Sequence, residues 1–429
     1  LGNEDKYLVL LTEYDDHRVE MLRFLCAIFS DSLFKSSVGY DSCSNKWLEV
    51  ATSNDVPYAE VTFYSLLNSV LGYDSIGWSY GSVLTADTSV HVMEYSVYIL
   101  LMLLDYGQPI IVLNNSVNQS RMESSSINNE SMGQVVPESA INNMSKLQNL
   151  IGFNVYRKIL SCFLTGSEDL QYITDGFLRL FTSIHNYYSM VYNASKSYIP
   201  SLGVNNYTAI PADDSILLLF WKFLQECPTF LHHMLEYDPQ SLLNITAMIL
   251  NSMLIHRKTP SRTKYMYVCT FILLKLSSER SFSVLLNRPY NTGGEVPGGV
   301  DMVASEIPLF YGNYTDLMIL VLHKVIVNSH QNLINRIHCI LTIISNISPY
   351  CKCLCNVTAM KIVNLFEYFS KSSYIFANTT NYAHVAVLLE VFNNIIQYQY
   401  DGNCNVIYAI LRSEAAFHRL EAITYNGMV

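Results

Sequence analysis

The sequence predicts an all-α protein, an α-solenoid of HEAT- or armadillo-like helical repeats. Apolar residues recur at the i, i+3, i+4, i+7 spacing of amphipathic helices in about fourteen segments, whereas the alternation typical of strands is missing. In the C-terminal third, helix pairs open near Thr315, Asn356 and Asn403, at steps of about 40 to 47 residues. This spacing is the period of HEAT and armadillo arrays.

The composition sets the protein class. Half of the 429 residues are hydrophobic and only 14% are charged, so the chain has ample material for a buried core and is not intrinsically disordered. A net charge of −10 disfavours nucleic acid as a partner, because phosphate backbones would be repelled. No apolar run reaches the roughly 18 residues that a membrane-spanning helix needs.

The predicted helices are justified by their apolar faces. A helix at 57–71 precedes a Gly-containing turn, and segment 316–327 is apolar nearly all round, as expected for a helix between neighbouring repeats. Three further helices show one stripe each: Leu333, Ile337, Ile340, Leu341, Ile344 and Ile347, closed by Pro349; Val357, Met360, Val363 and Phe366, with Asn356 as N-cap; and Leu388, Val391, Phe392, Ile395 and Ile396, closed by Asp401-Gly402.

Breaks in the helical pattern divide the chain. We expect N-terminal helical repeats at 1–106, a flexible Asn/Ser-rich insertion at 107–146 and middle repeats at 147–287. A Gly/Pro loop at 288–308 then leads to C-terminal repeats at 309–429.

No motif indicates catalysis or a cofactor. The glycine spacing at 72–77 resembles a phosphate-binding loop, but Trp78 stands where the lysine belongs, which favours a plain turn. Cys351, Cys353 and Cys355 lie near two histidines in the sequence, yet alternating cysteines point apart, so incidental thiols are favoured over a metal site. An enzyme or metal enzyme within the array stays an open alternative.

A basic cluster stands out in the acidic chain. It consists of His256, Arg257, Lys258, Arg262 and Lys264. Such a cluster is a candidate contact for anionic lipid headgroups or an acidic partner, worth about 1 kcal/mol per basic residue at a charged membrane. The alternative is a solvated loop around Pro260.

Several blocks resemble one family. The segment 389–403 continuing through 406–412 closely resembles the high-temperature-induced dauer formation protein family, relatives of dymeclin, and 307–324, 341–350 and 219–222 agree with it. The residues that resemble the family's central motif are Ser278, Glu279, Arg280 and Phe282, followed by Asn287, Pro289 and Tyr290. The chain resembles the middle of the family pattern, and we expect it to be a fragment or an incomplete gene model, because it begins at Leu1 without a methionine.

The resemblance implies a non-enzymatic, peripheral protein of the medial and trans-Golgi, acting with trafficking proteins in protein sorting and secretory-vesicle biogenesis. It implies no cofactor. It also implies that a lipidated glycine upstream of Leu1 anchors the protein to the cytosolic face of the membrane, with exchange between cytoplasm and Golgi. A soluble armadillo-type transport adaptor without a membrane role is the alternative, although three tryptophans without regular spacing count against it.

One candidate partner surface lies within the most similar segment. It comprises Asn393, Asn394, Gln397, Tyr398 and Tyr400. These amides and tyrosines either face a partner or stitch neighbouring repeats together, as such ladders do in repeat proteins.

Overall fold

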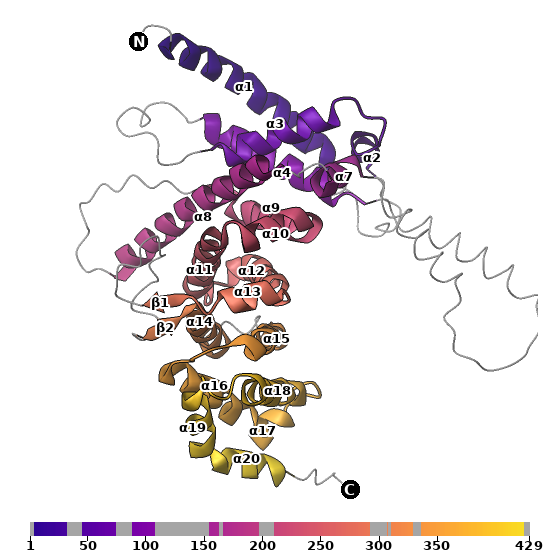
Figure 1. Ribbon diagram of the computed structural model, residues 1–429. Coiled ribbons are helices and arrows are strands. Elements are labelled where there is room, and N and C mark those ends of the chain that lie inside the picture. Colours follow the sequence, from indigo (N-terminus) through magenta and orange to yellow (C-terminus); the bar gives the residue numbers. More distant parts are fainter. Residues whose placement is uncertain are drawn as a thin grey trace, which may run out of the picture. The chain divides into compact units, whose positions relative to one another are not determined.

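The computed structural model describes residues 4–31, 45–73, 88–107, 154–162, 166–196, 210–291, 307, 310–328 and 336–423. Within these ranges the protein is all-α except for one pair of short strands, which confirms the all-α part of the predicted fold class, whereas the solenoid arrangement stays a prediction (Figure 1). Leu333, residues 108–146 of the insertion predicted at 107–146, and most of the Gly/Pro loop lie outside the described residues. The chain forms two compact units, 1–73 with 78–165 and 74–77 with 166–429. The finer division into repeats stays a prediction.

The first unit is built around α4. Its helices are α1 (Glu4–Phe29), α2 (Lys46–Ala51), α3 (Ala59–Leu71), α4 (Thr88–Asp105) and α7 (Val155–Cys162). Helix α4 packs against α1 and α3, and α3 also contacts α7. Phe63, Met93 and Leu100 are fully buried where these helices meet. Each such side chain contributes roughly 1.5–3 kcal/mol by leaving water.

Two asparagines join successive helices of this unit. Asn45 accepts hydrogen bonds from the first turn of α2 and donates to the carbonyls at the end of α1. Asn154 makes the same arrangement between the end of α4 and the first turn of α7. Helix ends leave backbone groups without partners inside the helix, so one amide side chain that serves two ends fixes the angle between the helices.

The second unit contains the remaining elements. They are α8 (Ser167–Lys196), α9 (Asp213–Glu226), α10 (Pro228–Glu236), α11 (Pro239–His256), η4 (Pro260–Arg262), α12 (Thr263–Ser277), α13 (Arg280–Leu285), β1 (Pro289–Asn291), β2 (Tyr311–Asn313), α14 (Tyr314–Asn328), α15 (Ile337–Ile347), η6 (Ser348–Tyr350), α16 (Asn356–Phe369), α17 (Ser372–Ile375), α18 (Tyr382–Tyr398), α19 (Cys404–Arg412) and α20 (Glu414–Glu421). The strands pair antiparallel, with Tyr290 opposite Gly312.

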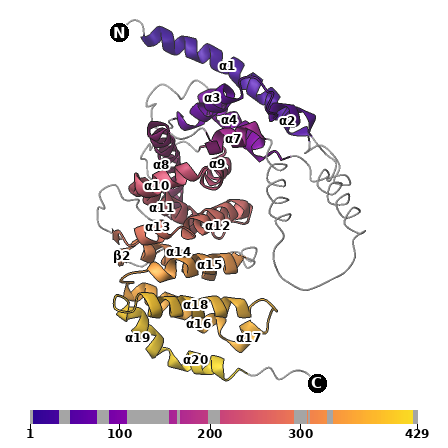
Figure 2. The same cartoon turned by 45° about the vertical axis from the view of Figure 1, so that its right-hand side comes forward.

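Helices of the second unit pack in two rows. Helix α8 contacts α11, α11 contacts α14, α14 contacts α16, and α16 contacts α19. In the other row α9 contacts α12, α12 contacts α15, and α15 contacts α18 (Figures 1 and 2). Helices α11 and α14 are buried on nearly all sides, which confirms the expectation for 316–327. Phe177, Phe220, Phe223 and Phe230 form an aromatic cluster where α8, α9 and α10 meet.

Three details of the predicted helices were wrong. The N-cap of α16 is Cys355, and Asn356 is already the first helical residue. Met360 is 49% exposed and Ile396 is 43% exposed, although both were expected to face inward. The reason is the helical period, because other residues already fill the buried i, i+3, i+4, i+7 face of each helix. These are Ala359, Ile362, Val363 and Phe366 in α16, and Leu388, Val391, Phe392 and Ile395 in α18. A residue one position further along the helix turns about 100° away.

Candidate interaction site

A hydrogen-bonded polar site in the second unit surrounds the loop between η6 and α16, residues 351–355. This loop carries the three alternating cysteines, and its backbone cannot pair in a ladder or helix. Buried backbone groups need partners, because an unpaired one costs about 1–3 kcal/mol. Side chains from three other segments supply them: Asn287, Asn313, Asp316 and Asn403.

Asn287 lies just after α13 and holds the first part of the loop. Its Nδ2 donates to the carbonyl of Tyr350 at 2.9 Å, and its Oδ1 accepts from the backbone N–H of Lys352 at 2.8 Å. An asparagine side chain presents a donor and an acceptor side by side, which matches the two edges of a peptide backbone.

Asn313 and Asp316 form the second support. The backbone N–H of Asn313 donates to Asp316 Oδ2 at 3.1 Å, and the N–H of Asp316 donates to Asn313 Oδ1 at 2.9 Å, a reciprocal cap at the start of α14. The remaining atoms reach the loop: Asn313 Nδ2 donates to the carbonyl of Lys352, and Asp316 Oδ1 accepts from the N–H of Cys355, both at 2.9 Å. Asp316 is fully buried.

Gly312 leaves room for this carboxylate. A Cβ at this position would lie 2.1 Å from Asp316 Oδ2 and 3.2 Å from Phe310 Cδ2. The close approach of strand β2 to Asp316 therefore requires glycine.

Asn403 holds the loop from the C-terminal side. Its Oδ1 accepts from the N–H of Leu354 at 2.9 Å, and its Nδ2 donates to the carbonyls of Cys351 and Gln399 at 2.8 and 2.9 Å. Asn403 is fully buried. The loop thus connects α13, β2, α14 and the segment before α19 into one hydrogen-bonded unit.

The residues of the family motif divide between surface and interior. Phe282 is fully buried, Tyr290 stacks with Phe310 and meets Tyr314 edge to face, and Pro289 begins β1. Glu279 pairs with Lys275 at 2.8 Å on the surface. Ser278 and Arg280 are exposed, and Asn287 belongs to the loop network.

The alternating cysteines have three different environments. Cys351 is buried and its thiol donates to the carbonyl of Ile347, whereas Cys353 is exposed, with a positive φ of 53°. Cys355 is half-buried, with its sulfur 3.2 Å from Thr358 Oγ1. Across the described ranges, no group of three or more His, Cys, Asp or Glu side chains is arranged to hold a metal ion.

Arg262 of the basic cluster is engaged in an internal network. Its guanidinium donates to Asp213 Oδ1 at 3.0 Å, to Asp214 Oδ1 at 3.1 Å and to the hydroxyl of Tyr188 at 2.5 Å. The Tyr188 hydroxyl in turn donates to Asp213 Oδ2. These contacts tie the segment before α12 to α9 and α8, and they direct the arginine toward carboxylates of its own chain.

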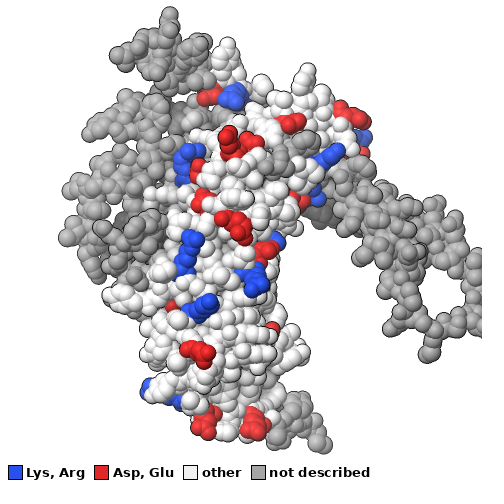
Figure 3. Space-filling view, in the orientation of Figure 1, with Lys and Arg blue, Asp and Glu red and all other residues white. Residues whose placement is uncertain are grey.

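The other members of the cluster do not share one surface. His256 and Arg257 are buried, and Arg257 donates to the carbonyl of Leu254. Burial and the neighbouring charge of Arg262 lower the pKa of His256 to about 4, so its ring is neutral at pH 7. Lys258 and Lys264 are exposed. Basic and acidic side chains are interspersed on the visible face of the second unit (Figure 3). The lipid contact stays a prediction.

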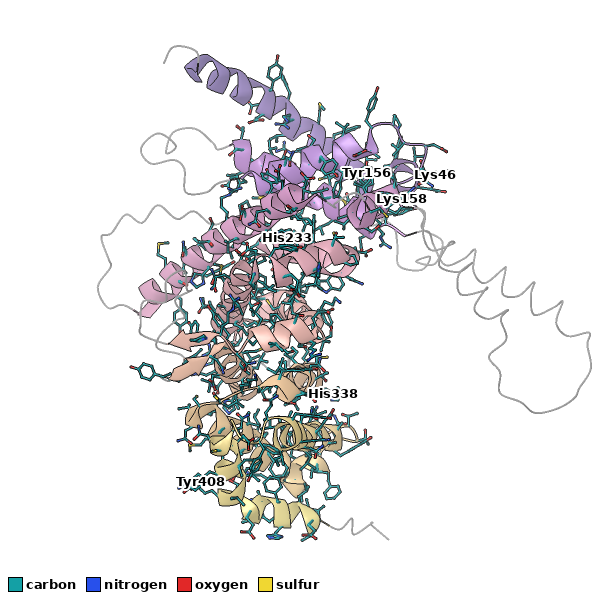
Figure 4. All side chains as sticks on the ribbon, in the orientation of Figure 1. Lys46, Tyr156, Lys158, His233, His338 and Tyr408 are labelled. Carbon is teal, nitrogen blue, oxygen red and sulfur yellow. The ribbon has the colours of Figure 1, made fainter. Side chains whose placement is uncertain are left out.

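The candidate partner surface on α18 is partly exposed. Asn393 and Gln397 face solvent, and Tyr398 and Tyr400 are 57% and 56% exposed. Asn394 instead donates to Ser348 Oγ at 3.0 Å and stitches α18 to η6. Figure 4 labels Tyr408 on α19 and His338 on α15, and Tyr408 is 64% exposed. Partner binding by these residues stays a prediction.

The loop network was only partly visible in the sequence. Asn287 and Asn403 fall in blocks that resemble the family, and Gly312, Asn313 and Asp316 fall within the block 307–324, but the sequence alone assigns none of these residues to the loop network. The available signal was the Gly-Asn-x-x-Asp spacing directly before an apolar helix, which is a capping pattern.

Comparison with known proteins covers nearly the whole chain. The family model "Dymeclin: Dyggve-Melchior-Clausen syndrome protein" matches residues 1–426. Protein HID1 of Mus musculus is 32% identical over 413 residues, 95% of this chain and 46% of the mouse protein. Protein HID1 of Dictyostelium discoideum is 29% identical over 408 residues, 94% of this chain and 41% of that protein.

A fission yeast relative is more distant. The Ubp5-interacting protein ftp105 of Schizosaccharomyces pombe is 24% identical over 420 residues, 95% of this chain and 39% of that protein. The chain thus spans less than half the length of the curated relatives named here. No solved structure matches it. The family match over 1–426, together with the 32% identity to mouse HID1, shows that this chain belongs to the dymeclin family.

Proposed function

We propose that this chain is the interaction array of a non-enzymatic, peripheral Golgi and trans-Golgi scaffold that acts in protein sorting and secretory-vesicle biogenesis. The observation that carries the proposal is family membership across 1–426. The dymeclin family is not a known enzyme family, and the hydrogen-bonded sites of the second unit connect helices rather than open onto a reaction centre.

The two rows of helices support an array of HEAT-like repeats. In the proposal, the pairs α11 with α12, α14 with α15 and α16 with α18 are successive repeats, each of which buries its apolar face against the next. Such stacking gives extended surfaces, which suit the binding of several proteins at once. The loop network at 351–355 then fixes the angle between two successive repeats.

One relative's name favours binding over chemistry. The fission yeast relative is named for its interaction with Ubp5, and we carry over only the general property, a protein that acts by binding another protein. No helix in the described ranges is long and apolar enough to cross a bilayer. In the proposal, the intact protein attaches through a lipidated N-terminus. A single acyl chain binds membranes only marginally, so Lys258 and Lys264 are candidates for the second signal.

Proximity labelling from the intact protein tests the proposal. A biotin ligase fused to the intact protein should label proteins of Golgi sorting and vesicle formation. A matched fusion carries Asn287→Ala and Asn403→Ala, which remove two supports of the loop. This fusion should label only part of the proteins that the unaltered fusion labels. A set dominated by nuclear-transport proteins would instead favour the soluble adaptor.

A further inference from the structure

The turn between α11 and α12 carries an exposed threonine that caps no helix (Figure 1). Thr259 stands at the N-cap position of η4, and its side chain makes no capping hydrogen bond. The backbone of the turn is fixed instead. The N–H of Thr259 donates to the carbonyl of His256 at 2.9 Å, and the N–H of Arg262 donates to the carbonyl of Thr259 at 3.2 Å. An ordered turn therefore presents the Thr259 hydroxyl at the surface.

The residue after Thr259 indicates which chemistry this hydroxyl undergoes. Pro260 follows it, and a residue before proline is restricted to extended conformations. Thr259 has such a backbone, with φ −94° and ψ 109°. An extended Ser or Thr followed directly by proline is the sequence that proline-directed protein kinases select. Proline suits that position because it brings no backbone N–H that would need an acceptor in the kinase.

The fold leaves one such pair accessible. The sequence contains two Ser/Thr-Pro pairs, Thr259-Pro260 and Ser348-Pro349. Ser348 is 1% exposed, and its hydroxyl donates to the carbonyl of Ser345 and accepts from the Asn394 side chain. A kinase cannot reach this buried and bonded hydroxyl in the folded protein, whereas Thr259 is exposed.

Thr259 lies within the basic cluster, where a phosphate changes the surface charge most. Lys258 precedes it directly and Lys264 follows in the first turn of α12, and both lysines are exposed. Arg262 is directed toward Asp213. A phosphate carries about −1.5 to −2 charges at pH 7, enough to offset two lysines. Phosphorylation within a basic cluster thereby cancels its attraction to anionic lipid.

We propose that Thr259 is a phosphorylation site for a proline-directed kinase, and that its phosphate abolishes the contact of Lys258 and Lys264 with anionic lipid. In the reaction, Thr259 Oγ1 bonds to the γ-phosphorus of ATP, and the bond from that phosphorus to the β,γ-bridging oxygen breaks. The hydroxyl proton passes to the kinase base, and ADP leaves. The effect on lipid rests on the proposed membrane contact, whereas phosphate acceptance does not, so the two can fail separately.

The first test is phosphate acceptance by the whole folded chain. Incubation with a cyclin-dependent kinase and Mg-ATP should place a single phosphate on Thr259, as measured by peptide mass spectrometry. Thr259→Ala should remove this phosphate, and Pro260→Ala should slow its transfer about tenfold or more. Ser261→Ala is the matched control, because Ser261 is an exposed neighbour without a following proline, and it should accept phosphate as fast as wild type. No phosphate, or phosphate mainly on another residue, would overturn the proposal.

The second test is flotation of the lipidated intact protein with liposomes. Kinase treatment should weaken flotation with phosphatidylserine liposomes about tenfold and leave flotation with phosphatidylcholine liposomes unchanged. Thr259→Ala treated with the same kinase is the control and should float like the untreated protein. An equal loss with both lipids would overturn the charge mechanism.

Unchanged flotation after phosphorylation would overturn the effect on lipid, and the lysines then show which part failed. If Lys258→Glu with Lys264→Glu weakens flotation while the phosphate does not, the membrane contact stands and its control by Thr259 is wrong. If neither change has an effect, the membrane contact itself is wrong. Urea denaturation of the phosphorylated chain completes the test. Unchanged flotation with a lower free energy of unfolding would mean that the phosphate draws Arg262 away from Asp213 instead.

Discussion

Asn287 and Lys352 lie 65 residues apart in the sequence, and the backbone N–H of Lys352 donates to Asn287 Oδ1 at 2.8 Å. On the other side of the same loop, Asn403 bonds Leu354 and Cys351. The loop between η6 and α16 is therefore held by asparagines from both the preceding and the following parts of the chain. This relationship gives two residues of the family-like blocks a structural role.

Replacing Asn287 with alanine should destabilise the second unit. The carbonyl of Tyr350 and the N–H of Lys352 would lose their partner. Because the first bond is part-buried and the second is exposed, we expect the free energy of unfolding to fall by about 0.5–1.5 kcal/mol, the net contribution of a typical hydrogen bond. Asn393→Ala on the exposed face of α18 is the control and should change it by less than about 0.5 kcal/mol. Urea denaturation followed by circular dichroism measures both. Equal effects of the two substitutions would contradict the loop assignment.

Gly312→Ala should be more disruptive than Gly402→Ala. The new methyl group at 312 meets Asp316 Oδ2 at 2.1 Å and forces a buried carboxylate away from its backbone donors, at a cost of about 2–4 kcal/mol. At 402, the nearest atom is Cys353 N at 3.5 Å, an ordinary contact. Thermal unfolding should give a lower Tm for Gly312→Ala than for Gly402→Ala. A Gly312→Ala variant as stable as wild type would show that β2 does not approach Asp316 this closely.

Acid should destabilise the protein partly through His256. Its pKa falls from 6.5 to about 4 on folding because the ring is buried and next to Arg262, so the folded state resists protonation. Above pH 6.5 the histidine is neutral in both the folded and the unfolded state, and its contribution to stability is fully present. As the pH falls from 6.5 toward 4, the free energy of unfolding decreases by up to about 3 kcal/mol.

His256→Phe should flatten this part of the pH profile. Phenylalanine keeps the packing on Tyr188, whose ring centroid lies 4.5 Å from that of His256, and cannot be protonated. His418→Gln is the control, because His418 is exposed and its pKa is raised by the hydrogen bond that its ring donates to the Glu414 carboxylate. Urea denaturation at pH 7, 6 and 5 gives the free energy of unfolding at each pH, and hence the slope of its pH dependence for each variant. A His256→Phe profile as steep as wild type would disprove the assignment.

The three alternating cysteines should react at different rates. Thiolates are the reactive species, and burial strongly raises the pKa of Cys351, so iodoacetamide should label exposed Cys353 about 100-fold faster in the native protein. Peptide mass spectrometry over time gives both rates, and unfolding in urea should remove the difference. Comparable native rates would mean that the loop opens readily.

Charge reversal of the exposed lysines tests the lipid contact. Lys258→Glu with Lys264→Glu leaves the Arg262 network intact and should weaken flotation of the lipidated intact protein with phosphatidylserine liposomes about tenfold or more. Lys46→Glu, at an exposed site on α2 labelled in Figure 4, is the control. Unchanged flotation would remove these lysines from the membrane contact.

Much of the fold could be predicted because helix periodicity is a local property. The stripes in α15 and α18 and the buried α14 follow from residues within a few turns of each other. Helix ends were less predictable: Cys355 rather than Asn356 caps α16, since the Asp316 carboxylate accepts from the N–H of Cys355. That contact spans 39 residues and has no local signature.

The sites were less predictable for the same reason. Five basic residues close in sequence looked like one patch, yet two of them are buried and Arg262 faces Asp213, which is 49 residues away. Spacing along the chain gives the face of a helix, but not which partner covers that face.

Imaging of the intact tagged protein tests the central proposal most directly. A scaffold of Golgi sorting predicts a juxtanuclear signal that coincides with a trans-Golgi marker, together with a cytoplasmic pool. A signal confined to the nuclear rim, or a diffuse signal with no Golgi enrichment, would contradict it.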